Sequence, residues 1–251
     1  MNEHLTIVGH DLKFPKVSLT EPSRSFYLHI AAEIDRSPFP FFLATSRRKK
    51  IVIAEAKKWC KKVSAEDGVV SADVFNAILI PPGTGKLLKE RPGTPLARYD
   101  FAILIEVSTQ QKLSEILQGE AYKRLRANLE KITEKVHIIT ATNVKRIASV
   151  DHNKQGVFLF NYFYADDRIQ NLEVWEYTAG WFQKETGLDN STVLLPINEK
   201  TSQYKIINHC RWDSIWDILP SLLFKKSFHS YVLDNFYANK VAAMPVLYKL
   251  A

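Results

Sequence analysis

The sequence holds few cysteines and no long apolar run, and both scarcities restrict the class of protein. Cys60 and Cys210 are its two cysteines, too few for a disulfide framework or a cysteine-rich zinc site. No run of about 18 apolar residues occurs, so we expect no membrane-spanning helix. The N-terminal stretch MNEHLTIVGHDLKFPKV lacks the basic start and apolar core of a signal peptide. These features predict a cytoplasmic protein with no membrane partner.

The motifs of metal and nucleic-acid binding are also missing. The histidines do not form an HxxxH or HExxH spacing, so we predict no metal site. The basic-Gly-aromatic pattern of RNA-recognition motifs is absent, which makes nucleic acid an unexpected partner. The net charge is +7, with basic residues concentrated between 47 and 62. We interpret that run as the solvated face of a helix, with binding of an acidic partner as the alternative.

What the sequence does contain is a repeated order of strand, helix, strand, strand, helix, strand. In the first half the patterns predict strands at 39–45, 74–80, 99–107 and 137–141, and helices at 50–63 and 113–132. In the second half they predict strands at 157–164, 192–196, 204–212 and 244–250, a helix over 172–182 that ends by Gly187, and two helical runs between 213 and 240.

This order predicts an N-terminal arm (1–37) followed by two βαββαβ units (38–150 and 151–251). Each unit forms a four-stranded antiparallel sheet with both helices on one face. The other face is largely apolar in this sequence, so it must be covered. We therefore predict an α+β fold in which the two units pack sheet to sheet.

On this layout the chain resembles the dimeric α/β-barrel superfamily, in which two ferredoxin-like units close into a barrel. The resemblance covers 38–251 and is carried best by the second-half segments FLFNYFYADD, LEVWEYTAGWFQKETGLDNS and AAMPVLYKL. The superfamily includes small cofactor-free monooxygenases, EthD-like proteins, isomerases and haem proteins related to chlorite dismutase. The resemblance implies a small-molecule-binding, oxygenase-like or isomerase-like enzyme within an intrachain α/β barrel. Haem is a further candidate cofactor, and a homodimer is a further expectation.

The strand over 204–212 carries the candidate catalytic pair. Alternation places His209 and Arg211 side by side on one face, where they can polarise or deprotonate a small acidic substrate. If haem is bound, His209 is the candidate axial ligand. A structural alternative is a buried ion pair between Arg211 and Glu106, which occupies the matching position of the first unit.

Further candidates lie elsewhere in the second unit. Asn161, the third catalytic candidate, stands among aromatic residues on the first strand of that unit. Trp175, Tyr177 and Trp181, on the following helix, are the candidate substrate-binding residues. The resemblance implies a pocket between sheet and helices lined by an Asn, a Trp and a His, here Asn161, Trp175 and His209. Aromatic residues at helical spacing are also typical of a packed core.

Two hypotheses for function therefore stay open. The first is a small-molecule enzyme with its pocket in the second unit. The second is a non-catalytic binding or scaffold module, in which side chains fill the interior and Glu106 pairs with Arg211. A cavity of roughly 300 Å³ or more would favour the first hypothesis.

Overall fold

The computed structural model describes residues 5–9, 11–133 and 135–251. In chain order its first half contains β1 (Phe26–Ala32), α1 (Arg47–Val63), β2 (Val69–Leu79), α2 (Leu87–Glu90), β3 (Phe101–Val107), α3 (Gln110–Gln118), α4 (Glu120–Ile132) and β4 (Val136–Arg146). Its second half contains β5 (Val157–Ala165), α5 (Arg168–Thr186), β6 (Thr192–Pro196), the short 3₁₀ helix η1 (Glu199–Thr201), β7 (Ile206–Trp212), α6 (Ile215–Phe224), the π-helix η2 (Phe228–Leu233), α7 (Asp234–Ala238) and β8 (Val241–Leu250).

The eight strands form one closed barrel in the order β1-β3-β2-β8-β5-β7-β6-β4. All neighbouring strands are antiparallel. The strands of the first half run β4-β1-β3-β2, and those of the second run β8-β5-β7-β6, which is the same order of fourth, first, third and second strand. Pairing of β2 with β8 and of β4 with β6 joins the halves and closes the barrel. The predicted α+β fold of two units in an intrachain barrel is confirmed.

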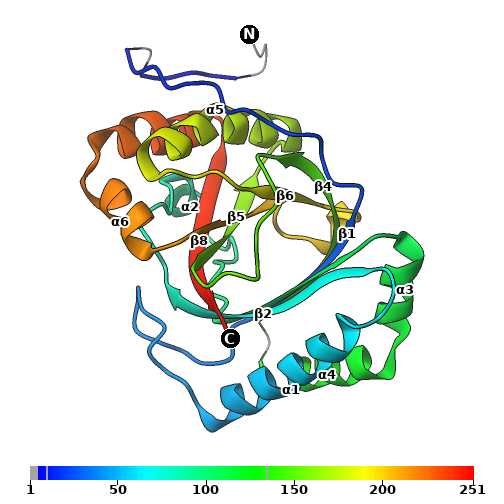
Figure 1. Cartoon of the computed structure of the whole chain (residues 1–251). Coiled ribbons are helices and arrows are strands. Elements are labelled where there is room, and N and C mark those ends of the chain that lie inside the picture. The colour runs from blue at the N-terminus through cyan, green and yellow to red at the C-terminus, as the bar shows by residue number, and fades with distance from the viewer. Residues whose placement is uncertain (1–4, 10, 134) are drawn as a thin grey trace.

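Three apolar layers hold this arrangement together, and the helices lie outside the barrel (Figure 1). One layer packs α1, α3 and α4 against the outer face of the first four strands. A second packs α5, α6, η2 and α7 against the outer face of the last four. The third fills the barrel itself with side chains from both halves, many of them aromatic. Each half therefore covers the inner sheet face of the other, as the apolar pattern predicted.

Local sequence signals explain where the helices begin and end. Ser46 caps α1 by accepting a hydrogen bond from the Lys49 amide, and Ser214 forms a capping box with Asp217 at the start of α6. Gly187 ends α5 in the left-handed conformation, with φ of 68°, which a residue without a Cβ adopts freely.

The first predicted strand is wrong. The first strand of the barrel is β1, which lies within the segment expected to be an arm, while 39–45 is a loop that makes one bridge through Phe41. Phe39 and Leu43 are 67% and 74% exposed there, so their apolar character does not reflect burial in a sheet. The helix expected over 113–132 also differs, because Gly119 divides it into α3 and α4.

The N-terminal segment before β1 packs along the helices of the second half (Figure 1). The Asn235 and Asn239 side chains accept hydrogen bonds from the Val8 and Thr6 amides at 3.0 and 2.9 Å. At the crossing with α5, a Cβ on Gly180 would lie 1.8 Å from the Pro15 carbonyl oxygen, so this close approach requires glycine. Within the described residues, no helix combines the length and the apolar character needed to cross a membrane.

Candidate functional site

Two small apolar cavities lie between the second-half sheet and its helices, where the sequence predicted a pocket. Their volumes are about 30 and about 20 Å³. Leu159, Asn161, Phe182 and Phe236 line both cavities. We call this pair the helix-side cavities. Each has room for about one or two water-sized molecules, well below the few hundred Å³ of an open ligand pocket.

Asn161 is the polar residue that both helix-side cavities share. Its side chain is 8% exposed, and its Oδ1 atom is fully buried with no hydrogen-bond donor among the described residues. By contrast, Oδ1 of Asn208, on the wall of the larger cavity, accepts a hydrogen bond from the Ser191 hydroxyl at 2.5 Å. An unsatisfied buried carbonyl costs about 1–3 kcal/mol, so Asn161 is placed to accept a hydrogen bond from a ligand.

The predicted aromatic residues divide between cavity wall and core. Trp175 lines the larger cavity. Trp181 lies deeper in the helix layer, where its indole N–H donates to the Ser227 hydroxyl at 3.0 Å. Tyr177 stacks on Tyr231, with ring centroids 5.0 Å apart. Trp181 and Tyr177 are therefore packing residues of this layer, and neither lines the helix-side cavities.

His209 lies on the other face of the sheet, inside the barrel. Its ring stacks on Phe160 with centroids 4.2 Å apart, and its Nδ1 donates to the Leu159 carbonyl at 3.0 Å. Because successive residues of a strand point to opposite faces, His209 is separated by the sheet from Asn161 and Trp175. The structure does not bring the predicted Asn, Trp and His together.

Arg211 does not pair with Glu106, so the predicted ion pair is wrong. The Arg211 guanidinium contacts the Asp213 carboxylate at 2.7 Å and the Gln155 carbonyl. Glu106 accepts a weak hydrogen bond from the Ser23 hydroxyl at 3.5 Å. Glu106 and Arg211 do occupy matching positions of the two halves. However, their strands β3 and β7 lie on opposite sides of the eight-stranded ring. Arg211 pairs instead with Asp213, two residues along the chain.

A polar chain that the sequence did not predict leads into the barrel beside His209. The Asp73 carboxylate lies 2.6 Å from Nδ1 of His152, and Nε2 of His152 lies 2.8 Å from Nε2 of His209. Since Nδ1 of His209 donates to the Leu159 carbonyl, Nε2 of His209 accepts the hydrogen bond from the Nε2–H of His152. The other ring nitrogen of His152 lies against the Asp73 carboxylate, so His152 links Asp73 to His209.

Burial, together with the neighbouring His152 charge, holds the pKa of His209 well below its usual value. A neutral His209 is therefore the expected state near neutral pH. No spacing in the sequence could reveal this chain, because Asp73 and His209 lie 79 and 57 residues from His152. Among the residues that the structure describes, no group of three or more His, Cys, Asp or Glu side chains converges in a way that could hold a metal ion.

Comparison with known proteins gives a match in structure and none in sequence. No protein-family model matches the chain, and no curated protein sequence matches it. An anthrone oxidase-like protein superposes with a TM-score of 0.61 at 12% identity, covering 90% of this chain and 91% of its own. A monooxygenase-like protein from Fusobacterium nucleatum gives 0.53 at 11% identity, covering 90% of each chain. A chlorite dismutase variant from Candidatus Nitrospira defluvii gives 0.52 at 10% identity, covering 92% and 93%.

The chain has the dimeric α/β-barrel fold. At these identities the likeness concerns the fold alone, and it agrees with the eight-stranded barrel and its two helical layers. The α/β barrel places the helix-side cavities and the buried Asp73–His152–His209 chain on opposite faces of one sheet.

A chlorite dismutase shares the α/β-barrel fold, so haem is the candidate cofactor for this chain. The residues present do not fit a haem group. His209, the predicted axial ligand, uses both ring nitrogens in hydrogen bonds inside the barrel. The helix-side cavities have no histidine among their lining residues, and their volumes are far below the several hundred Å³ of a cofactor pocket.

Proposed function

We propose that the protein binds a small, largely apolar molecule with a hydroxyl group in the helix-side cavities and acts on it as an oxygenase-like or isomerase-like enzyme. The observation that carries this proposal is the unsatisfied Oδ1 of Asn161, a residue that lines both cavities. A ligand hydroxyl that donates to this oxygen removes the cost of the buried, unpaired carbonyl.

The fold supports the choice of reaction class. The anthrone oxidase-like protein and the monooxygenase-like protein share the fold over about 90% of this chain. Their names indicate oxidation of organic molecules, and mostly apolar pockets with a few polar groups are typical of small-molecule sites. The proposal takes the reaction class from these relatives and the binding site from the residues of this chain.

Binding requires the helix layer to move. Phe228, Val232 and Leu233 of the π-helix η2 line the smaller cavity, and Phe236 of α7 lines both. π-helical turns are rare and occur frequently at functional sites. Displacement of η2 and α7 would join the two cavities into one pocket that ends at Asn161 and Trp175.

The assignment of roles follows from the faces of the sheet. Asn161 accepts the ligand hydroxyl, and Trp175 covers the ligand from α5. His209 and Arg211, which the sequence suggested as catalytic, lie on the barrel side and reach the ligand only through the backbone of β7. In this proposal they position the sheet, and they do not contact the substrate.

Anthrone, a tricyclic aromatic ketone with an enol form, is a suitable probe. We expect it to quench tryptophan fluorescence, because Trp175 and Trp212 line the larger cavity. Asn161→Ala should weaken this binding about threefold to tenfold, the equivalent of one lost hydrogen bond. Tyr177→Phe, on the same helix layer and outside the cavity wall, is the matched control and should bind as the unaltered protein does.

Oxygen uptake with anthrone separates the two hypotheses for function. Consumption of dioxygen that falls in Asn161→Ala and persists in Tyr177→Phe supports an oxygenase-like enzyme. Binding without oxygen uptake or isomerised product supports a non-catalytic binding module, which the filled barrel interior favours. Equal binding by the unaltered protein and Asn161→Ala would remove Asn161 from the site.

A further inference from the structure

A cleft much larger than the helix-side cavities lies at the end of the barrel where β4 and β7 begin. Its volume is about 600 Å³, within the usual range of about 300–1,000 Å³ for small-molecule sites. Its lining includes Arg126, His137, Lys200, Ser202 and Gln203. We call it the barrel-end cleft. It adjoins a second cleft of about 850 Å³ beside the start of α1, with which it shares Glu130 and Thr133.

His137 is a wall residue of the barrel-end cleft with one unused nitrogen. The Ser202 hydroxyl donates its only proton to the Tyr204 carbonyl at 2.7 Å, so it must accept the hydrogen bond from Nε2 of His137 at 3.3 Å. The proton of His137 is therefore on Nε2, and Nδ1 holds a free lone pair. Nδ1 is buried and has no donor among the described residues, in a side chain that is 5% exposed.

His137 is also held neutral. Burial lowers its pKa from 6.5 to about 4, so near neutral pH it accepts a hydrogen bond through Nδ1 and carries no charge. The rings packed against it are His29, Tyr99, Tyr162 and Tyr204, and the ring of Tyr204 lies nearest, with centroids 4.9 Å apart. A hydroxyl or N–H of a ligand would supply the donor that the fold does not.

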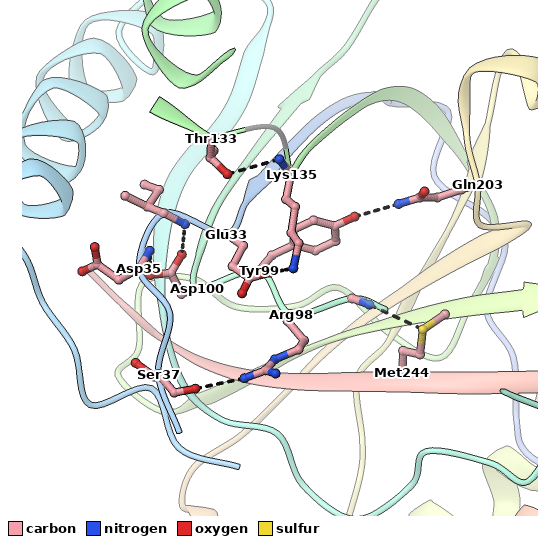
Figure 2. Close-up of polar contacts among 12 residues, drawn as sticks. Glu33, Asp35, Ser37, Arg98, Tyr99, Asp100, Thr133, Lys135, Gln203 and Met244 are labelled. Carbon is pink, nitrogen blue, oxygen red and sulfur yellow. Dashed lines mark hydrogen bonds and ion pairs between the residues drawn. The ribbon is translucent and has the colours of Figure 1, made fainter. Parts of the chain in front are cut away.

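The tyrosines beside His137 leave a complementary proton. Gln203 donates to the hydroxyls of Tyr99 and Tyr204 at 2.8 and 3.0 Å, and those hydroxyls lie 3.0 Å apart (Figure 2 shows the Gln203 contact with Tyr99). One phenolic proton makes the bond between the two tyrosines. The other has no acceptor among the residues that the structure describes. The cluster thus offers one acceptor and one donor to a bound molecule.

The two adjoining clefts have a surplus of positive charge. Their lining includes six basic side chains and three acidic ones. Lys135 pairs with Glu33 at 2.5 Å, as Figure 2 shows, and Arg126 pairs with Glu130 at 2.7 Å. Lys200 is exposed and forms no ion pair with any described residue. Such a surplus favours an anionic ligand.

We propose that the barrel-end cleft is a binding site for a small organic anion that bears a hydroxyl group. Nδ1 of His137 is buried behind the cleft wall, so binding requires that wall to open; the ligand hydroxyl then donates to Nδ1, and the carboxylate or similar anion lies toward Lys200 and Arg126 at the rim. This site shares no lining residue with the helix-side cavities, so it does not depend on the function proposed for those cavities.

The test uses 4-hydroxybenzoate as the probe and benzoate as its matched analogue without the hydroxyl, both titrated calorimetrically into the whole protein. We expect 4-hydroxybenzoate to bind about fivefold more tightly than benzoate, the effect of one neutral hydrogen bond. Lys200→Ala should weaken the binding of 4-hydroxybenzoate about twofold to fivefold. Lys226→Ala, which alters an exposed lysine elsewhere, should leave this affinity unchanged. Asn161→Ala should also leave it unchanged, which distinguishes this site from the helix-side cavities.

A second measurement needs no substitution in the core. In a histidine ¹H–¹⁵N spectrum of the unaltered protein, saturation with 4-hydroxybenzoate should shift the Nδ1 resonance of His137, and benzoate should shift it less. Three outcomes overturn the proposal: no binding of 4-hydroxybenzoate at millimolar concentration, equal affinity for both probes with an unmoved Nδ1 resonance, or unchanged affinity in Lys200→Ala.

Discussion

Lowering the pH should destabilise the protein through histidines that are buried in the neutral form. The fold lowers the pKa of His29 to about 3 and that of His137 to about 4, mainly because burial disfavours the charged ring. Both values lie below the 6.5 of an exposed histidine. Between these limits the unfolded chain binds more protons than the folded one. The stability that these neutral histidines contribute is therefore complete above pH 6.5, and the free energy of unfolding decreases as the pH falls below that value.

The magnitude follows from the size of the window. Each pH unit below 6.5 lowers the free energy of unfolding by about 1.4 kcal/mol for each histidine that stays neutral in the fold. At pH 5 the loss is about 2 kcal/mol each for His29 and His137, about 4 kcal/mol together. His209 acts in the same direction, because its pKa is lowered as well. A loss of this size is a large part of the 5–15 kcal/mol that stabilises a typical domain.

Urea titrations at pH 7.5 and pH 5 measure this loss directly. His137→Gln keeps a donor for Ser202 and removes one titrating group, so it should reduce the loss by about 2 kcal/mol. His229→Gln alters an exposed histidine and should leave the pH dependence as it is in the unaltered protein. The reasoning is refuted if the free energy of unfolding is equal at the two pH values, or if His137→Gln loses as much as the unaltered protein.

Two further predictions concern packing. Lys49→Met leaves the Asp100 carboxylate, 1% exposed and 2.9 Å from the Lys49 ammonium, without its countercharge, and should lower the free energy of unfolding by about 3–5 kcal/mol in urea titrations. Lys50→Met, at the exposed neighbouring position, should change it by less than about 0.5 kcal/mol. Gly180→Ala should displace the N-terminal segment at Pro15, costing about 1–3 kcal/mol in thermal unfolding and exposing that segment to limited proteolysis. A normally stable Gly180→Ala with a protected N-terminus contradicts the close packing described above.

The architecture was predictable because its signals are local and repeated. The predicted strand at 192–196 has the same bounds as β6, and the predicted C-cap Gly187 ends α5. These elements have an apolar period and a boundary residue within a few positions of each other. The strand at 39–45 failed because an apolar run containing Pro40 imitates a buried strand, whereas β1 follows a polar stretch that resembles an arm.

The polar arrangement inside the barrel was less predictable, since it depends on contacts between distant residues. Lys49 was grouped with the solvated lysines of α1, but it lies on the apolar side of that helix, where Asp100 makes its burial acceptable. His137 and His152 appeared as scattered histidines. Only the closure of the barrel reveals that one faces a cleft and the other links Asp73 to His209.

The two strand pairs that join the halves, β2 with β8 and β4 with β6, have a consequence for synthesis of the chain. Until the second half leaves the ribosome, β2 and β4 have no strands to pair with along one edge each, and the apolar inner face of the first sheet has no cover. Unpaired strand edges and bare apolar faces are the surfaces through which nascent chains associate wrongly. A truncated first half should therefore aggregate when it is expressed alone.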